Sequence, residues 1–333
     1  MAAVTGFRVA VLGATGAVGA EILQVLEERR FPVRELLACA SPDSEGDELQ
    51  FRDSTVKIVR ARGEVLAACD LVLSAAPAQL PGLLPALRRG QVRVIDVTGA
   101  LETDPEVPLW LPGLSTLPAG STRPRFVAVP RGVTTGIALA LAPFTAAGIL
   151  RRVTAVTLES ASGAGIAGVG ELTDHTVQVL NRMSGERAES EVFAQSLAFD
   201  CLPQIGTIEP DGQTSDEVRL RSVLRRLLSA PDLPIELTRV RMPTLGGSLA
   251  AVHVRLAKPV TVEEATQLWA AQPGIGLLGD EELPTPRGSL GHDEAAVGRV
   301  RATGDRLAFV VALNDLRLGA ALGVVGAAEA LIA

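Results

Sequence analysis

The sequence predicts an α/β protein with a Rossmann-type parallel sheet domain and a second, α+β domain with a mainly antiparallel sheet. A glycine turn between an apolar strand and a helix near the start predicts the first domain. Short apolar strands then alternate with helical segments as far as Val97, which is the βαβ pattern of a parallel sheet. Four further strands between residues 235 and 313 predict the second sheet.

Length, composition and charge limit the function classes. The chain has 333 residues, 47% of them hydrophobic, which is enough for two domains with large buried cores. Its net charge of -7 argues against nucleic acid or an anionic membrane as a partner. The first strand begins at Phe7, which leaves no room for a signal peptide. The uncharged run from Gly132 to Leu150 contains Pro143, and a buried helix explains it better than a membrane span.

Cysteines and histidines are few and scattered, without CxxC spacing, so we expect a reduced, cytoplasmic setting and no metal site. These residues are Cys39, Cys69, Cys201, His175, His253 and His292.

The glycine turn is the strongest local signal. The run Val9–Gly19 places Gly13, Gly16 and Gly19 where a dinucleotide fold needs a tight turn, a close phosphate approach and helix-on-strand packing. The N–H groups of the helix that follows would face an anion. The alternative is a turn kept for packing after the ligand was lost.

The predicted elements of the first domain alternate between strand and helix. They are the strand Phe7–Leu12, the helix Ala17–Arg30, the strand Val33–Cys39, a polar turn over 41–46, the strand Asp70–Ser74, the helix Leu83–Arg89 and the strand Val92–Val97.

From about Thr135 the pattern changes. The predicted elements there are the strand Val153–Leu158, the helices Val169–Leu180 and Ser215–Leu228, the strands Ile235–Arg241, Ala250–Leu256, Val297–Arg301 and Leu307–Leu313, and a buried alanine-rich helix Gly319–Ile332. We therefore expect a dinucleotide-binding domain over 1–134 with 314–333 and a second domain over 135–313, which the family resemblance given next implies is a substrate and dimerisation domain.

These landmarks resemble the aspartate-semialdehyde dehydrogenase family over nearly the whole chain. The matching segments include Leu12–Gly19, Asp104–Leu109, Ser162–Gly165, Ala198–Asp200, Arg241–Pro243, Pro284–Pro286, Val297–Arg301 and Asn314–Ala321. The resemblance implies a Rossmann domain interleaved with a dimerising domain. It also implies NADP-dependent chemistry through a cysteine thioester, with phosphate as the acyl acceptor.

The nucleophile that the resemblance implies is missing. Family members carry a cysteine in a Pro-Asn-Cys-Ser-Thr type of turn, and here Gly132 stands at that position. Glycine cannot form a thioester. Thr134 and Thr135 lie nearby but have no histidine in the same segment to activate them. Cys201 is better explained as a small buried core cysteine than as a replacement.

Three further family roles fall on unsuitable residues. Ser248 stands at the acid/base histidine, and a hydroxyl does not titrate near neutral pH. Glu159 stands at the glutamine that orients the reacting group and would add negative charge beside an anionic substrate. Glu102 stands at a phosphate-binding arginine and would repel phosphate.

Some positions of the family's substrate pocket remain. Arg241 matches the arginine that holds the substrate carboxylate, Arg219 a basic phosphate-site residue, and Glu217 the acid that meets the substrate ammonium. For Arg219 and Glu217, an ordinary solvated helix surface is an equally good explanation.

Cofactor contacts are implied at Gly13, Ala14, Thr15, Gly16, Ala17, Val18, Ser41, Ser162 and Gly163. Asp43 replaces an arginine near the 2′-phosphate of NADP and favours a free ribose hydroxyl. Ala76 and Pro77 would crowd the nicotinamide side, and Asp315 replaces a cofactor-facing asparagine. We therefore expect NAD or NADP to bind weakly or not at all, with NAD favoured over tight NADP binding.

The sequence thus predicts an aspartate-semialdehyde dehydrogenase-like protein that is catalytically inactive and has a binding or assembly role. It would form a homodimer, or a heterodimer with an active paralogue. One alternative is a nicotinamide-dependent oxidoreductase that acts on a small substrate without a cysteine thioester. Another is a metabolite sensor that uses the same pocket without turnover.

Overall fold

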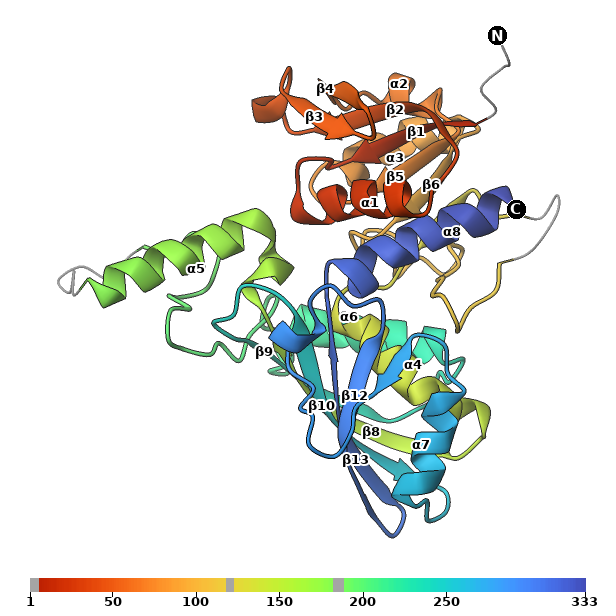
Figure 1. The fold of residues 1–333 in the computed structure, drawn as a ribbon, viewed down its shortest axis with the longest axis vertical. Coiled ribbons are helices and arrows are strands. Elements are labelled where there is room, and N and C mark those ends of the chain that lie inside the picture. Colours follow the sequence, from red (N-terminus) through yellow and green to blue (C-terminus); the bar gives the residue numbers. More distant parts are fainter. Residues whose placement is uncertain (1–5, 118–122, 182–188) are drawn as a thin grey trace. The chain divides into compact units, whose positions relative to one another are not determined.

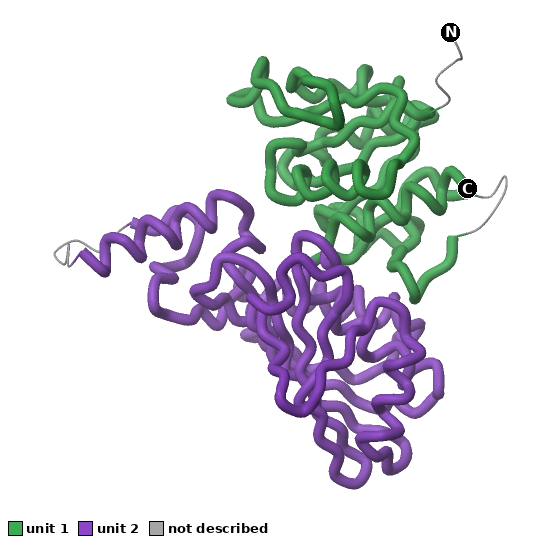
Figure 2. Tube along the Cα trace, viewed as in Figure 1, with its two compact units in different colours: residues 1–131, 320–333 green, residues 132–319 purple. Residues whose placement is uncertain are grey.

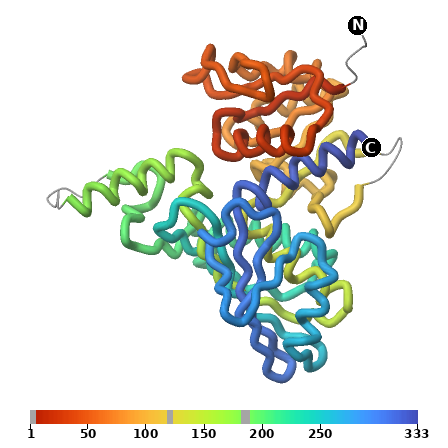
Figure 3. Tube along the Cα trace, viewed as in Figure 1, coloured from red at the N-terminus to blue at the C-terminus, as the bar shows by residue number. Residues whose placement is uncertain are grey.

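The computed structural model describes residues 6–117, 123–181 and 189–333. They form two compact units, residues 1–131 with 320–333 and residues 132–319 (Figure 2). The colours of Figure 3 show that the first unit joins the early part of the chain to its last helix.

The first unit contains a seven-stranded sheet in the order β3-β4-β2-β1-β5-β6-β7 (Figure 1). All neighbouring pairs are parallel except β3 with β4, so the predicted Rossmann-type sheet is confirmed. The strands are β1 (Phe7–Leu12), β2 (Val33–Ala40), β3 (Glu48–Phe51), β4 (Ser54–Arg60), β5 (Leu71–Ser74), β6 (Arg93–Asp96) and β7 (Phe126–Ala128).

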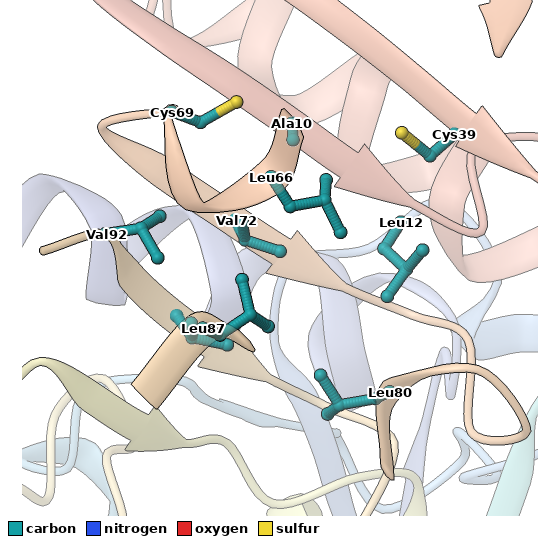
Figure 4. Packing of buried hydrophobic residues seen from close by; sticks show 10 residues of the cluster. Ala10, Leu12, Cys39, Leu66, Cys69, Val72, Leu80, Leu87 and Val92 are labelled. Carbon is teal, nitrogen blue, oxygen red and sulfur yellow. The ribbon is translucent and has the colours of Figure 1, made fainter. Parts of the chain in front are cut away.

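Four helices accompany this sheet: α1 (Ala17–Glu28), α2 (Gly63–Ala67), α3 (Leu80–Arg89) and α8 (Leu322–Ile332). Helix α8 contacts both α1 and β6, and its alanine and valine residues are almost all buried. The predicted burial of the closing helix is therefore confirmed within this unit. Figure 4 shows part of the core, in which Leu12 and Val72 of the sheet pack with Leu66, Leu80 and Leu87 of the helices.

The second unit contains a six-stranded sheet in the order β11-β12-β13-β10-β8-β9. Its three central pairs are antiparallel and its two outer pairs are parallel, which confirms a mainly antiparallel sheet. The strands are β8 (Leu150–Glu159), β9 (Ile235–Arg241), β10 (Ser248–Leu256), β11 (Ile275–Leu277), β12 (Ala295–Thr303) and β13 (Arg306–Leu313).

Helices α4 (Val133–Ala146), α6 (Ser215–Leu227) and α7 (Val262–Ala270) pack on this sheet. Helix α4 is buried along nearly its whole length, as predicted for the uncharged run. Trp269 of α7 donates its indole N–H to the carbonyl of Ala140 at 2.8 Å, which locks α7 onto α4. After β8 the chain forms a 3-10 turn, η3 (Ala161–Ala164), and then helix α5 (Gly165–Leu180) (Figure 1). Leu172 of α5 packs in a small apolar cluster with Ala161, Leu197 and Leu202.

Several elements were not predicted: the β3–β4 hairpin, α2, β7, α7 and β11. The hairpin and α2 are short and half-exposed, so they lack the apolar periodicity that marks a buried element. Helix α7 carries a readable signal, because Thr261 and Glu264 form a capping box. Among the described residues, no helix is long and apolar enough to cross a membrane.

Candidate functional site

The glycine turn of the first unit has the geometry of a tight strand-to-helix connection. Gly13 has a φ of +88°, and the backbone N–H groups of Gly13 and Ala14 both donate to the carbonyl of Cys39, at 2.8 and 2.9 Å. A Cβ on Gly19 would lie 2.0 Å from the carbonyl oxygen of Gly13. Gly19 is therefore required for α1 to approach β1 closely.

Other residues of the predicted cofactor site follow the carboxyl ends of β2 and β5, the two strands that pair with β1. Ser41 precedes a 3-10 turn after β2, and Asp43 is exposed within that turn. The methyl group of Ala76 lies beside Gly13, because a Cβ on Gly13 would come within 3.2 Å of it. Glu102 is almost completely buried in this unit, at 1% exposure.

In the second unit, Gly132 stands at the N-cap of α4 with a φ of 57° and a ψ of -139°. L-residues rarely adopt this conformation, whereas glycine reaches it without strain. Its N–H donates to the carbonyl of Gly319 at 2.7 Å. A Cβ on Gly319 would lie 2.9 Å from the Cα of Gly132, so these two glycines bring the backbones of α4 and η5, the π-helical turn Arg317–Ala321, into contact.

A buried carboxylate, Asp315, accepts hydrogen bonds from three serine hydroxyls that lie in two other segments of the chain. Ser162 and Ser160 donate to its Oδ2 at 2.8 and 3.1 Å, and Ser248 does so at 3.4 Å. The backbone N–H of Gly247 donates to Oδ1 at 3.2 Å. Ser162 and Ser248, assigned by the resemblance to cofactor and acid/base positions, are thus brought together around Asp315.

A second buried carboxylate, Glu159, forms a two-pronged ion pair with Arg239, from Nε to Oε1 at 2.8 Å and from Nη2 to Oε2 at 2.7 Å. Both side chains are more than 90% buried. Arg239 also contacts Asp216 at 3.1 Å. The sequence predicts that Glu159 adds negative charge beside a substrate, and in the structure Arg239 pairs with this charge.

The pKa directions agree with this pairing. Burial alone would raise the pKa of Glu159, but the charge and hydrogen bonds of Arg239 hold it below its ordinary value. Burial would lower the pKa of Arg239, and the Glu159 carboxylate raises it instead. Burial does lower the pKa of Arg241, and the charge of Glu159 offsets this only in part.

Arg241 is 7% exposed at the end of β9. Its Nη1 donates to the carbonyl of Ser160 at 2.6 Å, and the guanidinium carbon lies 6.0 Å from the ring centroid of Phe193. A Cβ on Gly163 would lie 2.4 Å from the same Nη1, so Gly163 leaves room for the guanidinium. Arg241 and Gly163, predicted separately, form one local structure.

Glu217 and Arg219 are not solvated surface residues. Glu217 is 7% exposed, and its two oxygens accept from the backbone N–H groups of Thr214 and Arg239, at 2.8 and 3.0 Å. It closes a capping box with Thr214 at the start of α6. Arg219 forms an ion pair with Asp216. Both side chains therefore have structural partners within the protein.

Sequence reasoning missed Arg239 and the central position of Asp315. A signal for Arg239 exists: it shares one face of β9 with Arg241 at a spacing of two, and buried arginines need a carboxylate. Cys201 is exposed, which corrects its prediction as a core residue. Within the described parts of the chain, no cluster of three histidine, cysteine or acidic side chains could hold a metal ion.

Comparison with known proteins identifies the family. A model described as "Semialdehyde dehydrogenase, NAD binding domain" matches residues 8–117, and one described as "Semialdehyde dehydrogenase, dimerisation domain" matches residues 141–318. The chain is 34% identical to aspartate-semialdehyde dehydrogenase 2 of Vibrio cholerae over 98% of each chain.

Solved structures support the same family assignment. The crystal structure of aspartate semialdehyde dehydrogenase II complexed with ASA, from Vibrio cholerae, matches with a TM-score of 0.88, 32% identity and 98% coverage of both chains. A structure of a probable aspartate-semialdehyde dehydrogenase from Pseudomonas aeruginosa has the same TM-score at 28% identity, covering 98% of this chain and 99% of that one. This chain therefore belongs to the semialdehyde dehydrogenase family and is similar to the aspartate-semialdehyde dehydrogenases along its full length.

Proposed function

We propose that this chain is a catalytically inactive aspartate-semialdehyde dehydrogenase-like protein with a binding or assembly role. The observation that carries the proposal is the backbone of Gly132, the position at which the family resemblance implies the nucleophile. Its φ of 57° with a ψ of -139° suits glycine and strains any L-residue. The chain therefore has no thiol at this position, and its backbone there is one that a cysteine would adopt only with strain.

Two neighbouring positions support the same conclusion. Ser248 hydrogen-bonds to Asp315 and has no group that titrates near neutral pH, so it supplies no proton transfer. Both carboxylate oxygens of Glu159 accept hydrogen bonds from Arg239, so neither oxygen is available to orient a reacting group. Ser248 and Glu159 are therefore both held by partners within the protein, and neither supplies the family role that the resemblance implies at its position.

We propose weak or absent cofactor binding, with NAD preferred to NADP. The tight turn at Gly13 and the close packing at Gly19 favour a dinucleotide. The exposed carboxylate of Asp43 after β2 repels a 2′-phosphate and accepts from a ribose hydroxyl. The assembly role would use the dimerisation domain, in a homodimer or in a heterodimer with an active paralogue.

The test is reduction of NADP and NAD by the purified protein with aspartate semialdehyde and phosphate, using the Vibrio cholerae relative as a positive control. We expect no turnover by the native chain. We also expect none from Gly132→Cys, because Ser248 still supplies no acid/base group and the new side chain strains the backbone. Turnover by the native chain would overturn the proposal.

Gly132→Ala is the matched control, because it adds a Cβ at this position, as Gly132→Cys does, but no thiol. Apart from its two chain neighbours, no atom of the described residues would lie within 4 Å of a Cβ at this position, so any destabilisation reports backbone conformation and not a clash. We expect both variants to lose about 1–2 kcal/mol of unfolding free energy, measured by urea denaturation.

A nicotinamide-dependent oxidoreductase without a thioester is the second candidate, favoured by the buried guanidinium of Arg241. Such an enzyme would bind NAD tightly and act on a small anionic substrate. Calorimetric titration with NAD separates the two proposals, because micromolar affinity favours the enzyme and no measurable binding excludes it.

A further inference from the structure

One face of α6 carries an arginine-rich stripe that the site described above does not use. The opposite face of the helix packs into the core through Leu220, Val223, Leu224 and Leu227. The stripe lines a cavity of about 470 Å³ together with Pro231, which follows the helix. Its residues recur at the spacing of a single helical face: Val218, Arg221, Ser222, Arg225, Arg226 and Ser229.

Within residues 6–117, 123–181 and 189–333, the cavity is lined by three guanidinium groups and no carboxylate. The acids of α6 are Asp216 and Glu217 in its first turn, and both have partners elsewhere, Arg239 and Thr214 among them. An ordinary solvated helix face mixes charges of both signs, and this chain has a net charge of -7. The concentration of positive charge along this cavity is therefore a local feature of the fold.

Two of the arginines have donors to spare. Arg225 donates through Nε to the carbonyl of Leu233 at 2.9 Å, a bond that uses neither of its Nη atoms. Arg221 hydrogen-bonds through Nη2 to Gln213, while its Nε is buried and has no partner among the described residues. A ligand does not reach the buried Nε, but Nη1 of Arg221 and both Nη atoms of Arg225 remain as donors for an acceptor.

The stripe is separate from the phosphate-site position implied by the family resemblance. That position is Arg219, which belongs to the Asp216 and Arg239 network. Arg219 does not line the cavity.

We propose that the face of α6 that carries Arg221 and Arg225 binds an organic phosphate with at least two phosphoryl groups. Planar guanidinium forks match phosphate oxygens in pairs. The hydroxyls of Ser222 and Ser229 add donors, and Val218 and Pro231 provide an apolar wall. The volume exceeds that needed by a single phosphate and lies in the range of small-molecule sites.

The test is calorimetric titration of the full chain with inorganic pyrophosphate, with citrate as a carboxylate of similar charge. We expect pyrophosphate to bind more tightly than citrate. The double variant Arg221→Gln/Arg225→Gln should weaken pyrophosphate binding by roughly tenfold or more, since it removes two charge-assisted contacts.

Two further variants test the proposal while leaving every arginine of the stripe in place. Ser222→Asp places a carboxylate in the stripe without removing an arginine, and it should weaken binding similarly. Arg89→Gln removes an exposed arginine from the last turn of α3 in the first unit and should leave binding unchanged. Equal binding by the native chain and the double variant, or equal affinity for citrate and pyrophosphate, would overturn the proposal.

Discussion

Single residues decide the chemistry of this chain, and the clearest case is Glu159. In isolation, a glutamate at this position predicts a negative charge at the site. The structure pairs it with Arg239, a residue eighty positions away, and the two oppositely charged side chains neutralise each other in the core. A buried charge must be interpreted together with its partner, which the linear sequence does not identify.

Replacing Glu159 with Gln leaves Arg239 buried beside Asp216 alone. We expect a loss of about 3 kcal/mol of unfolding free energy at neutral pH. The pKa of Glu159 lies below its ordinary value of 4.5, so the stabilisation is present above that value and is lost as the pH falls through the folded-state pKa. Urea denaturation should therefore show a difference between native and variant protein that shrinks below about pH 4.

Glu236→Gln is the control for this prediction. Glu236 forms an ion pair with Arg152 on the surface, where both side chains are more than half exposed. Its replacement should leave the unfolding free energy nearly unchanged at every pH, because exposed pairs contribute little. An equal effect of the two substitutions would contradict the role assigned to the buried pair.

At the scale of elements, strand-to-helix packing in the first unit depends on the absence of one side chain. Helix α1 lies so close to the end of β1 that a methyl group at position 19 would collide with the backbone of Gly13. This packing holds the turn in the shape that a dinucleotide phosphate needs.

Gly19→Ala should separate α1 from β1 and lower the unfolding free energy by about 2–3 kcal/mol. Thermal denaturation measures the loss, and NAD titration measures any accompanying loss of affinity. Gly82→Ala in α3 is the matched control, because no atom lies within 4 Å of its Cβ and its φ is ordinary. It should be neutral or stabilising by about 0.5–1 kcal/mol. Equal destabilisation by Gly19→Ala and Gly82→Ala would contradict a steric clash at position 19. It would indicate that replacing any helical glycine has the same effect.

The elements differ in how much the sequence reveals. Strand β9 and the start of α1 were predicted to the residue, because apolar spacing and glycine turns are local signals. The hydrogen bonds that converge on Asp315 join residues 160, 162, 247 and 248, and no local pattern joins residues so far apart. Arg239 was missed for the same reason, since its partner is defined by the pairing of β8 with β9.

At the scale of the whole molecule, the first unit is assembled from two distant parts of the chain. Helix α8 comes after the entire second unit in sequence and packs against α1 and β6. The second unit is continuous, from Gly132 to Gly319. The stability of the first unit therefore depends on residues 320–333, whereas the second unit does not contain them.

Deleting residues 320–333 should destabilise the first unit alone, because it removes the buried face of α8. Hydrogen exchange should speed up in β1, β5 and β6 and stay unchanged in β10 and β13. Alanine substitution of Glu329, which contacts Arg29 at 2.8 Å on the exposed side of α8, should have little effect. Uniformly faster exchange in both sheets would contradict the division into two units.

The pairing of Glu159 with Arg239 also bears on how this lineage can evolve. A mutation that neutralises either residue alone leaves the other charge buried without its partner, so each single substitution gives a less stable protein. Positions 159 and 239 should therefore change together or not at all in this lineage, whereas the residues of an exposed pair such as Arg152 and Glu236 can change one at a time.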